Sequence, residues 1–319
     1  MKISVLGCGR WGTFIAWYLN KIGNDVLIWG RSSSNNFLEL KNTGKNSYLS
    51  LPSNIKLTND LKEALDYSEI IVISIGSQSL RNLMQNVSDF NIENKIFVLC
   101  MKGIEVSSGK RLTEVMGEFI PKSSKTAIWV GPGHVEDFVK GIPNCMVIDS
   151  EGEEVKKLLV KSFSSDLIRF YYGTDLIGNE IGAAAKNVVG IAAGMLDGLE
   201  YSSLKGALMS RGTREIARLI KAVGGNEISA YGLAHLGDYE ATLFSEHSHN
   251  RKFGEMYIKG ENYDKLAEGV FTVKALLNMA DKYGVELPIS DAVNQIIDLK
   301  KDPKEILSNL FVRSIKHEF

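Results

Sequence analysis

A single lysine interrupts a run of small residues in the second half of the sequence. The stretch is NEIGAAAKNVVGIAAG, and the lysine is Lys186. On a helix its neighbours three and four positions away are Gly182, Ala183, Val189 and Gly190. None is a carboxylate that could pair with it. Small neighbours let another backbone or a ligand approach closely, and loss of water there would lower the pKa of the amine towards the working pH. The stretch therefore suits a proton donor for a carbonyl group, whereas an exposed lysine at this position would have no special role.

Three glycines near the amino terminus have the spacing of a phosphate-binding turn. Gly7, Gly9 and Gly12 form the pattern GxGxxG after an expected strand at Ile3–Leu6 and before a helix expected to begin near Thr13. Glycines at these positions permit a tight turn and bring a pyrophosphate close to backbone N–H groups at the helix start. Because the motif occupies the first strand-to-helix turn, it favours dinucleotide binding over a purely structural turn.

The end of the second expected strand bears on the choice of dinucleotide. Sites that prefer NAD usually carry an acid there to bind the ribose hydroxyls. This strand ends LIWGR, and the nearest acid, Asp25, precedes it. Arg31 could pair instead with a 2′-phosphate, although a solvated surface arginine is the alternative. We hypothesise that the protein uses NADPH, alone or together with NADH.

Two further residues are candidates on position alone. Lys102, in LCMKGIE, follows a strand at the edge of the sheet where ligands of this architecture bind, although it is also readable as an ordinary loop lysine. Asn187 follows Lys186 and points about 100° around the helix. Its amide could hold a ligand or bridge to another helix.

The segment LAHLGDYEATLFSEHSHNRKFG gathers many polar groups. They include Asp238, Thr242, Ser248, His249, Asn250 and Arg251. Such neutral donors and positive charge are typical of a phosphate site. His235, His247 and His249 also suggest a metal site, but no HExxH pattern or cysteine pair accompanies them. We therefore predict no metal.

The first half of the sequence alternates short apolar runs with helical patterns. The runs are ISVLG, DVLIWG, EIIVISIG, KIFVLCMKG, TAIWVGPG and NCMVIDS. Runs of this kind are typical of buried parallel strands. Their succession predicts an α/β fold of the Rossmann-like type, in which helices cover both faces of a twisted sheet and ligands bind at the carboxyl ends of its strands.

After about Asp175 the strand-like runs stop and amphipathic helical patterns follow. Examples are SRGTREIARLIKAVGG and VKALLNMADKYG. We therefore predict two domains, a Rossmann-like dinucleotide-binding domain over residues 1–175 and an all-α substrate-binding and catalytic domain over residues 176–319. The segment FYYGTD marks the boundary, and the first long helix is expected to begin within a few residues of it.

Composition excludes several classes of protein. The formal charge of the 319 residues is -1, so no general field attracts nucleic acid or an anionic membrane. Three widely spaced cysteines, Cys8, Cys100 and Cys145, fit reduced thiols better than a disulfide framework. The amino terminus lacks the apolar run of a signal peptide, and the small-residue stretch around Lys186 is a poor membrane span. We expect a cytoplasmic protein.

Taken together, these motifs make the sequence similar to the bacterial type of NAD(P)-dependent glycerol-3-phosphate dehydrogenase. The resemblance extends over nearly the whole chain and is specific, because many motifs occur in order. They include GCGRWGT, LIWGR, MKGIE, GPGHVEDFVKGIP, GAAAKNVVGIAAGMLDGL, KGALMSRGTREIARL, GDYEATLFS, SHNRKFG and AEGVFTV. The resemblance implies an oxidoreductase that reduces dihydroxyacetone phosphate to sn-glycerol 3-phosphate with NADH or NADPH, reversibly, and supplies phospholipid synthesis.

The resemblance also implies roles for individual residues. The general acid is Lys186, Lys102 contacts both substrate and cofactor, and Asp238 orients the lysine or the substrate hydroxyl. Further substrate-binding positions are Gly131, Gly133, Asn187, Thr242, Ser248, His249 and Asn250. The cofactor positions are Gly7, Gly9, Arg10, Trp11, Gly12, Arg31, Lys102, Val135, His249 and Glu268. On this view Lys186 protonates the carbonyl oxygen while Lys102 steadies its developing charge.

Two departures from the family pattern affect the substrate prediction. Where the family has Ser-Arg-Asn-Arg, this chain has Ser248-His249-Asn250-Arg251, so a titratable imidazole replaces a permanent charge. Arg251 or another cation compensates, or phosphate binding is weaker and depends on pH, or the substrate differs. The family's Pro-Ser pair is also replaced, by Gly76-Ser77, which loosens a loop near the cofactor.

Two alternative functions remain at this point. One is an enzyme like the β-hydroxyacid dehydrogenases acting on a different small substrate, although that class spaces its lysine and asparagine by a helical turn and here they are adjacent. The other is a non-catalytic NAD(P)-binding protein, against which the presence of Lys102, Lys186 and Asp238 argues. A homodimer is possible, and no nucleic acid or membrane partner is expected.

Overall fold

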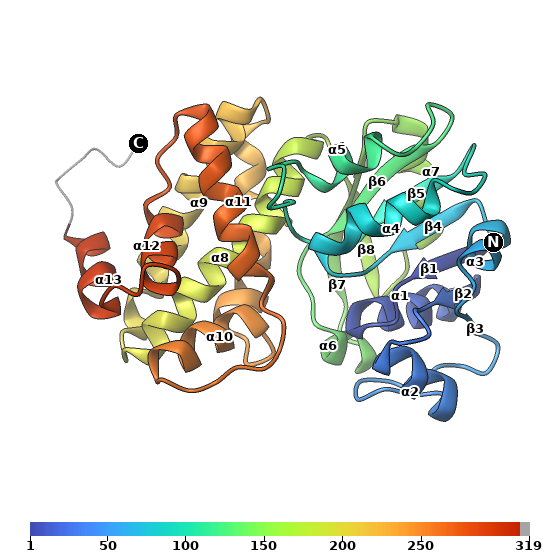
Figure 1. Ribbon diagram of the computed structural model, residues 1–319, viewed down its shortest axis with the longest axis horizontal. Coiled ribbons are helices and arrows are strands. Elements are labelled where there is room, and N and C mark those ends of the chain that lie inside the picture. The colour runs from blue at the N-terminus through green and yellow to red at the C-terminus, as the bar shows by residue number, and fades with distance from the viewer. Residues whose placement is uncertain (313–319) are drawn as a thin grey trace. The chain divides into compact units, whose positions relative to one another are not determined.

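The computed structural model describes residues 1–312, which fold into two compact units (Figure 1). The first unit comprises Met1–Lys102 and Lys110–Leu176, and the second comprises Gly103–Gly109 and the described residues from Ile177 onward. The segment Gly103–Gly109 therefore belongs with the second unit, whereas the sequence analysis drew one boundary between residues 175 and 176. The physical reason is Ile104, which is fully buried in the apolar core of the helical unit.

An eight-stranded sheet forms the centre of the first unit, with the strand order β3-β2-β1-β4-β5-β6-β7-β8. The strands are β1 (Lys2–Leu6), β2 (Asp25–Trp29), β3 (Lys56–Thr58), β4 (Ile70–Ile73), β5 (Ile96–Leu99), β6 (Lys125–Val130), β7 (Asn144–Ser150) and β8 (Ile168–Tyr172). The order reverses beside β1, where β1 pairs with β2 on one side and β4 on the other. This arrangement confirms the predicted α/β class, and such reversal points are where doubly wound sheets bind ligands.

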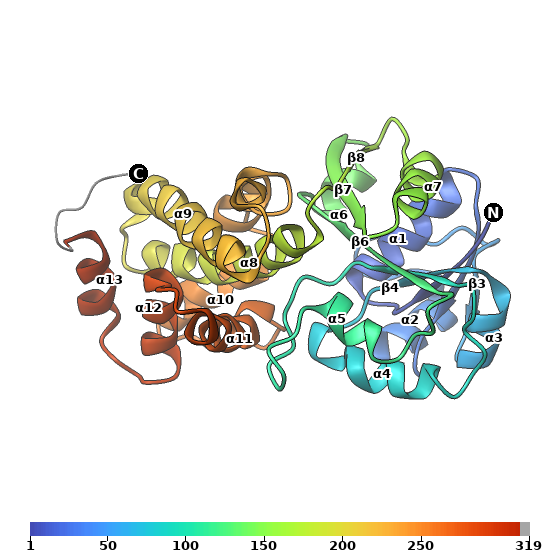
Figure 2. The ribbon, with the colours of Figure 1, turned by 90° about the horizontal axis from the view of Figure 1, so that it is seen from above.

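Helices cover both faces of this sheet (Figure 2). The helices are α1 (Arg10–Lys21), α2 (Asn35–Thr43), α3 (Leu61–Tyr67), α4 (Leu80–Val87), α5 (Leu112–Gly117), α6 (Val135–Val139) and α7 (Glu153–Phe163), with a 3-10 turn η1 at Ser77–Ser79. One face carries α1, α6 and α7, and the other carries α3, α4 and α5. Aromatic side chains fill the first face, where Phe14 of α1 stacks on Phe138 of α6.

Four details of the first unit differ from the expectations drawn from the sequence. The prediction that NCMVIDS is a parallel strand was wrong with respect to β6, because β7 runs antiparallel to β6 and parallel to β8. A run buried on both faces carries no information about its direction. Strands β3 and β8 were not predicted, since β3 has only three residues and β8 alternates buried and exposed positions. Finally, α1 begins at Arg10 rather than near Thr13.

Helices make up the second unit. They are α8 (Leu176–Gly198), α9 (Lys205–Val223), α10 (His249–Ile258), α11 (Glu268–Tyr283), α12 (Pro288–Ile297) and α13 (Pro303–Phe311). Short 3-10 turns occur at η2 (Ser202–Leu204), η3 (Glu227–Tyr231) and η4 (Leu236–Asp238), and a π-helical turn at η5 (Glu240–Phe244). Nearly all of α8 is buried, because α9, α10 and α11 pack around it. Within residues 1–312, no helix combines the length and apolar composition that crossing a bilayer requires.

Candidate active site

The glycine-rich turn of the first unit is built so tightly that two of its positions exclude a side chain. Gly7 has a φ of 121°, and a Cβ atom there would lie 2.0 Å from the carbonyl oxygen of Ser74. A Cβ atom on Gly12 would lie 2.2 Å from the carbonyl oxygen of Gly7. These close approaches require glycine. They hold the start of α1 directly against the end of β1.

Gly9, by contrast, faces open space. The nearest atom to a Cβ built on Gly9 is 3.9 Å away, in the side chain of Asn36. Gly9 is the N-cap residue of α1, no side chain caps the helix there, and its first turn contains no acidic residue. The first N–H groups of a helix attract anions, and nothing in the first turn of α1 supplies a negative charge. The turn therefore fits the pyrophosphate of a dinucleotide.

The remaining predicted cofactor residues of the first unit lie at element ends. Arg10 begins α1, forms an ion pair with Glu136 of α6, and lies over the ring of Tyr48 at 5.0 Å. Trp11 follows it and packs on Phe14. Arg31 is exposed just after β2, and Val135 is buried at the start of α6. All four positions therefore follow the carboxyl end of a strand, as ligand-binding residues of such sheets do.

Lys102 and Gly131, which are distant in sequence, meet in the first unit. The Lys102 amine donates a hydrogen bond of 2.7 Å to the Gly131 carbonyl oxygen. The two residues follow β5 and β6, which are adjacent parallel strands, so their ends lie at one edge of the sheet. Gly133 has a φ of 142°, and a Cβ there would collide with the ring of Phe138. The structure thus fixes Lys102 beside the GPGH segment.

In the second unit, the small residues around Lys186 form a row along α8. Lys186 stands in this row with Gly182, Gly190, Gly194 and Gly198, which are spaced four residues apart and so form a ridge that winds slowly around the helix. The segment 235–258 packs directly on this row. A Cβ on Gly190 would lie 2.7 Å from the Thr242 methyl group, and one on Gly194 would lie 1.8 Å from the Arg251 carbonyl oxygen. The sequence predicted that something would approach closely here, and the structure identifies it as another part of the same chain.

The approaching segment brings a carboxylate to Lys186. The Lys186 amine lies 2.5 Å from the Asp238 carboxylate and donates a 2.8 Å hydrogen bond to the Thr242 hydroxyl. The Lys186 side chain is 8% exposed and that of Asp238 is 1% exposed. Thr242 lies in the π-helical turn η5, and such turns are frequent at functional sites. The structure therefore brings two predicted site residues, Asp238 and Thr242, to the nearly buried amine of a third, Lys186.

A buried histidine and tyrosine support this cluster, and the sequence analysis assigned them no role in it. Burial lowers the pKa of His235 to about 4, with nearby Lys186 acting in the same direction. His235 Nδ1 lies 2.8 Å from the Gly182 carbonyl oxygen, and Nε2 lies 2.7 Å from the Tyr239 hydroxyl. Since a carbonyl only accepts, Nδ1 donates to Gly182 and Nε2 accepts from Tyr239. The sequence marked His235 only as a weak metal candidate, so no local pattern indicated this arrangement.

Asn187 bridges helices, which is one of the two roles that the sequence left open for it. Its side-chain oxygen accepts a 3.0 Å hydrogen bond from the amide nitrogen of Asn250, on α10. The Asn250 oxygen in turn accepts from the backbone N–H of Gly269 at 2.9 Å. Gly269 follows Glu268, the first residue of α11 and a predicted cofactor position. The bridge thus joins α8 to the starts of α10 and α11.

The predicted phosphate-binding run forms the start of α10. Ser248 is the N-cap residue, and its hydroxyl accepts from the Arg251 backbone N–H at 3.3 Å. His249 is the first residue of the helix, and its Nδ1 contacts the Tyr263 hydroxyl. The Arg251 guanidinium pairs with Asp197 at 2.6 Å and with Glu255 at 3.4 Å. Arg251 is therefore held by two carboxylates, which disfavours it as the replacement for the family arginine.

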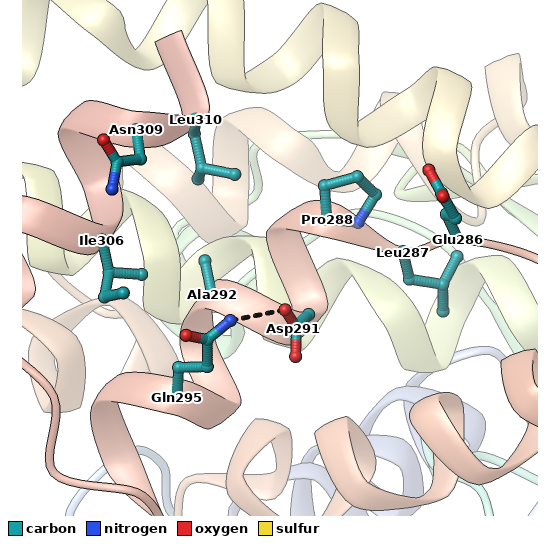
Figure 3. Close-up of a pocket in the computed structure, with 9 residues that line it drawn as sticks. All are labelled: Glu286, Leu287, Pro288, Asp291, Ala292, Gln295, Ile306, Asn309 and Leu310. Atoms are coloured by element: carbon teal, nitrogen blue, oxygen red, sulfur yellow. Dashed lines mark hydrogen bonds between the residues drawn. The ribbon is translucent and has the colours of Figure 1, made fainter. Parts of the chain in front are cut away.

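A separate cavity of about 490 Å³ lies between α12 and α13 (Figure 3). It is lined by Glu286, Leu287, Pro288, Asp291, Ala292, Gln295, Ile306, Asn309 and Leu310. Asp291 and Gln295 hydrogen bond to each other across one turn of α12. No residue predicted for the site lines this cavity. Residues 1–312 also contain no group of three or more histidine, cysteine or acidic side chains placed to hold a metal.

These features define a class of protein before any comparison. A glycine-rich turn opens a doubly wound sheet, and a helical unit follows that holds a nearly buried lysine against a carboxylate. That combination is typical of dehydrogenases that use a nicotinamide dinucleotide.

Comparison with known proteins identifies the family. Residues 2–156 match the family described as NAD-dependent glycerol-3-phosphate dehydrogenase N-terminus, and residues 175–308 match the corresponding C-terminus. The chain belongs to this family, which confirms the resemblance predicted from the sequence. Relatives named glycerol-3-phosphate dehydrogenase [NAD(P)+] include one from Fusobacterium nucleatum and one from a Thermoanaerobacter species. Each is 36% identical and matches 100% of this chain, over 98% and 99% of its own length respectively.

A solved structure supports the same conclusion for the fold. The crystal structure of glycerol-3-phosphate dehydrogenase from Coxiella burnetii is similar to this chain, with a TM-score of 0.91 and 27% sequence identity. The similarity covers 98% of this chain and 99% of the Coxiella chain. The α/β fold with a helical second part is therefore the fold of this family.

Proposed function

We propose that this protein reduces dihydroxyacetone phosphate to sn-glycerol 3-phosphate with NADH or NADPH, reversibly, and so supplies glycerophospholipid synthesis. The observation that carries the proposal is the nearly buried Lys186 amine, held 2.5 Å from Asp238, in a chain whose two halves both match this dehydrogenase family. A protonated amine of this kind can supply the proton that a ketone needs when it becomes an alcohol.

The dinucleotide would be held by the first of the two predicted domains, residues 1–175. Gly7, Gly9 and Gly12 would admit the pyrophosphate to the N-terminus of α1, with Arg10 and Trp11 beside it. Further cofactor positions are Arg31, Lys102, Val135, His249 and Glu268. When bound, the reduced nicotinamide supplies a hydride to the substrate carbonyl.

Lys186 would move the proton. As the carbonyl oxygen gains negative charge, the Lys186 ammonium gives it a proton and becomes a neutral amine, which takes the proton back during alcohol oxidation. Asp238 and Thr242 would hold the amine in position for both directions. General acid catalysis of this kind contributes about 100-fold to 10,000-fold in rate.

Other substrate contacts would come from both predicted domains. Lys102 would steady negative charge on the substrate oxygen, with Gly131 and Gly133 keeping the adjoining segment free of side chains. Asn187 would position the segment that binds phosphate through its bridge to Asn250.

Phosphate would bind at the start of α10. Ser248, His249 and Asn250 lie there with the first N–H groups of the helix, and helix N-termini favour anions. Because His249 stands where the family has arginine, the Michaelis constant for substrate should rise as pH increases through the titration of the imidazole. His249→Arg should flatten that dependence, and an equally steep profile in the variant would exclude the role.

Arg31 tests the choice of dinucleotide. The guanidinium is exposed just after β2, where a 2′-phosphate could reach it. Arg31→Ala should raise the Michaelis constant for NADPH and leave that for NADH nearly unchanged. If the preference between the two dinucleotides does not change, Arg31 has no part in it.

The cellular setting remains a prediction from sequence. We propose a cytoplasmic enzyme that acts on a small phosphorylated substrate without a nucleic-acid partner, and a homodimer is possible. Light scattering of the purified protein would determine its oligomeric state directly.

A steady-state assay tests the proposed function itself. Dihydroxyacetone phosphate, unphosphorylated dihydroxyacetone and small β-hydroxyacids would be compared with NADPH and with NADH, following absorbance of the reduced nicotinamide. We expect turnover with dihydroxyacetone phosphate and a much higher Michaelis constant for the unphosphorylated ketone. Turnover confined to a hydroxyacid would support the alternative enzyme class, and dinucleotide binding without turnover of any substrate would indicate a non-catalytic protein.

A further inference from the structure

We propose that His235 and Tyr239 act as a positioning pair that sets the place of Asp238 against Lys186, a role that rests on the proposed function of Lys186 as the proton donor. Neither residue is assigned a part in substrate or cofactor binding. Both are fully buried in the helical unit, and both lie in the segment that brings Asp238 and Thr242 to α8.

The first connection joins His235 to the helix that carries the lysine. His235 Nδ1 donates to the Gly182 carbonyl oxygen at 2.8 Å, one helical turn before Lys186. A Cβ on Gly182 would lie 2.9 Å from the His235 Cβ, so a side chain at residue 182 would push the two segments apart. The imidazole therefore fixes the distance between its own segment and α8 at a point adjacent to Lys186.

The second connection runs through Tyr239. The Tyr239 hydroxyl donates to His235 Nε2 at 2.7 Å, and the two rings meet edge to face with their centroids 4.8 Å apart. A Cβ on Gly212 would lie 3.1 Å from the Tyr239 hydroxyl oxygen, so the tyrosine also packs closely on α9. The pair thus connects α8 to α9 through the segment 235–239, which follows α9 in the chain.

Asp238 lies inside the loop that this pair closes. Its backbone N–H donates to the His235 carbonyl oxygen at 3.0 Å, in the 3-10 turn η4, and Tyr239 follows it directly. With His235 fixed on one side of Asp238 and Tyr239 on the other, the carboxylate has little freedom to move away from the lysine. Small displacements matter here, because a shift of about 1 Å in a catalytic group can cost about 100-fold in rate.

The protonation states of both residues suit these roles. Only a neutral imidazole can donate through Nδ1 and accept through Nε2 at the same time. Lys186 and Asp238 are the charged groups that act on His235, and burial is the main cause of its low pKa, about 4. Burial also raises the pKa of Tyr239, so its hydroxyl keeps the proton that it donates. Both hydrogen bonds are therefore available at neutral pH.

Kinetics of single variants provide the first test. Tyr239→Phe removes one hydroxyl and should lower kcat about tenfold, the effect of about 1.4 kcal/mol on a barrier. His235→Ala removes both connections and should lower kcat about 100-fold. His235→Asn keeps a donor for the Gly182 carbonyl and should recover part of the loss. In each case the Michaelis constants should change much less than kcat.

Tyr18→Phe is the matched control. Tyr18 is also fully buried, and its hydroxyl lies 2.8 Å from Ser165 and donates to the Phe163 carbonyl, all within the first unit. Its loss should lower the melting temperature as Tyr239→Phe does while leaving kcat unchanged. An equal fall in kcat in both variants would show that Tyr239 only stabilises the fold, and would overturn the proposal.

A double-mutant cycle separates positioning from general stabilisation. If the pair acts through Asp238, Tyr239→Phe should have little further effect on kcat once Asp238→Asn is present. If the two losses multiply, the pair does not act through Asp238 and the proposal fails.

A measurement without substrate tests the positioning pair independently of the proposed reaction. Losing the fixed carboxylate disfavours the charged amine, so NMR of labelled lysines should show Lys186 losing its proton at lower pH in Tyr239→Phe than in the wild type. Tyr18→Phe should not change this titration. If the wild-type protein fails to turn over dihydroxyacetone phosphate but the shift is seen, the substrate assignment is wrong and the positioning pair stands. An unchanged titration overturns the pair, whatever the substrate.

Discussion

The helical unit contains two buried lysine–aspartate pairs that differ in how they are held. Lys186 lies 2.5 Å from Asp238, and Lys205 lies 2.6 Å from Asp197. Their exposures are similar, with Lys186 8% and Lys205 6% exposed. Burial beside an aspartate therefore does not by itself mark a lysine as catalytic.

The two lysine–aspartate pairs differ in the residues that surround them. Asp197 also accepts from Arg251 at 2.6 Å and from the Ser202 hydroxyl at 2.6 Å, and Lys205 donates to the Leu243 carbonyl oxygen at 2.9 Å. These contacts join the end of α8 to α9, η5 and α10. Lys186 instead occupies a row of glycines, and its carboxylate comes from an irregular segment. The Lys205 pair is thus a structural junction, whereas we assign chemistry to the Lys186 pair.

Exchanging each lysine for arginine should separate the two pairs most clearly. Lys186→Arg keeps a positive charge beside Asp238, but a guanidinium does not release a proton in proteins. We expect kcat to fall at least about 100-fold, the lower range for loss of a general acid. Lys205→Arg should lower kcat little. The comparison would be refuted by near wild-type turnover in Lys186→Arg, measured at saturating substrate.

Removing the charge at the structural junction should affect stability instead. Lys205→Met leaves Asp197 with less compensation, and breaking a buried ion pair costs about 3–5 kcal/mol. Arg251 remains beside the carboxylate, so the lower end of that range is expected. Urea unfolding measures the loss, and turnover per folded molecule should change little. A variant of normal stability but low kcat would mean that the roles of the two pairs had been exchanged.

Glu215 is another buried carboxylate of the helical unit, and unlike Asp238 and Asp197 it has no lysine partner within residues 1–312. It accepts from the backbone N–H groups of Ile289 and Ser290 at the start of α12. Burial, only partly opposed by these hydrogen bonds, raises its pKa to about 7. Because the folded state holds this proton more tightly than the unfolded state, the contribution of Glu215 to stability is fully present below about pH 4.5 and is lost as pH rises through about 7.

The corresponding variant is Glu215→Gln, which cannot ionise. Between pH 4.5 and 7 the ionisation of Glu215 should lower the free energy of unfolding of the wild type as pH rises. The variant should lack this decline, so the two proteins should diverge by a few kcal/mol across the window. Urea unfolding of both proteins at each end of the window measures it. His235 has the opposite dependence and is present in both, so it cancels. Parallel profiles would show that Glu215 titrates normally.

The smallest effect is expected from the hydroxyl beside the Lys186 amine. Thr242→Val removes the acceptor of the 2.8 Å hydrogen bond from Lys186 while keeping the shape of the side chain. A loss of about 1 kcal/mol corresponds to about a fivefold fall in kcat. Thr272→Val is the control, because Thr272 is also buried and its hydroxyl donates to the Glu268 carbonyl oxygen of its own helix. Equal kinetic effects in the two variants would remove Thr242 from the site.

Much of the fold follows from local sequence. Apolar runs predicted β1, β2, β4, β5, β6 and β7, because a strand buried on both faces must be apolar along its length. The direction of β7 and the existence of β3 and β8 were not predictable in this way. Pairing direction depends on the partner strand, and an edge strand such as β8, with Arg169 and two tyrosines, lacks a continuous apolar run.

The residues of the candidate site likewise include some that the sequence indicated and some that only the tertiary structure brought together. The sequence alone determined the glycine turn and the small residues around Lys186, and a Cβ atom on Gly7, Gly12 or Gly182 would lie closer than 3.0 Å to another part of the chain. Only the tertiary structure decided what fills the space so created. Asp238 reaches Lys186, and His235 reaches Gly182, from a segment about fifty residues further along the chain. A charge that is buried must find its partner in space, and nothing in the spacing of residues along one helix records where that partner will come from.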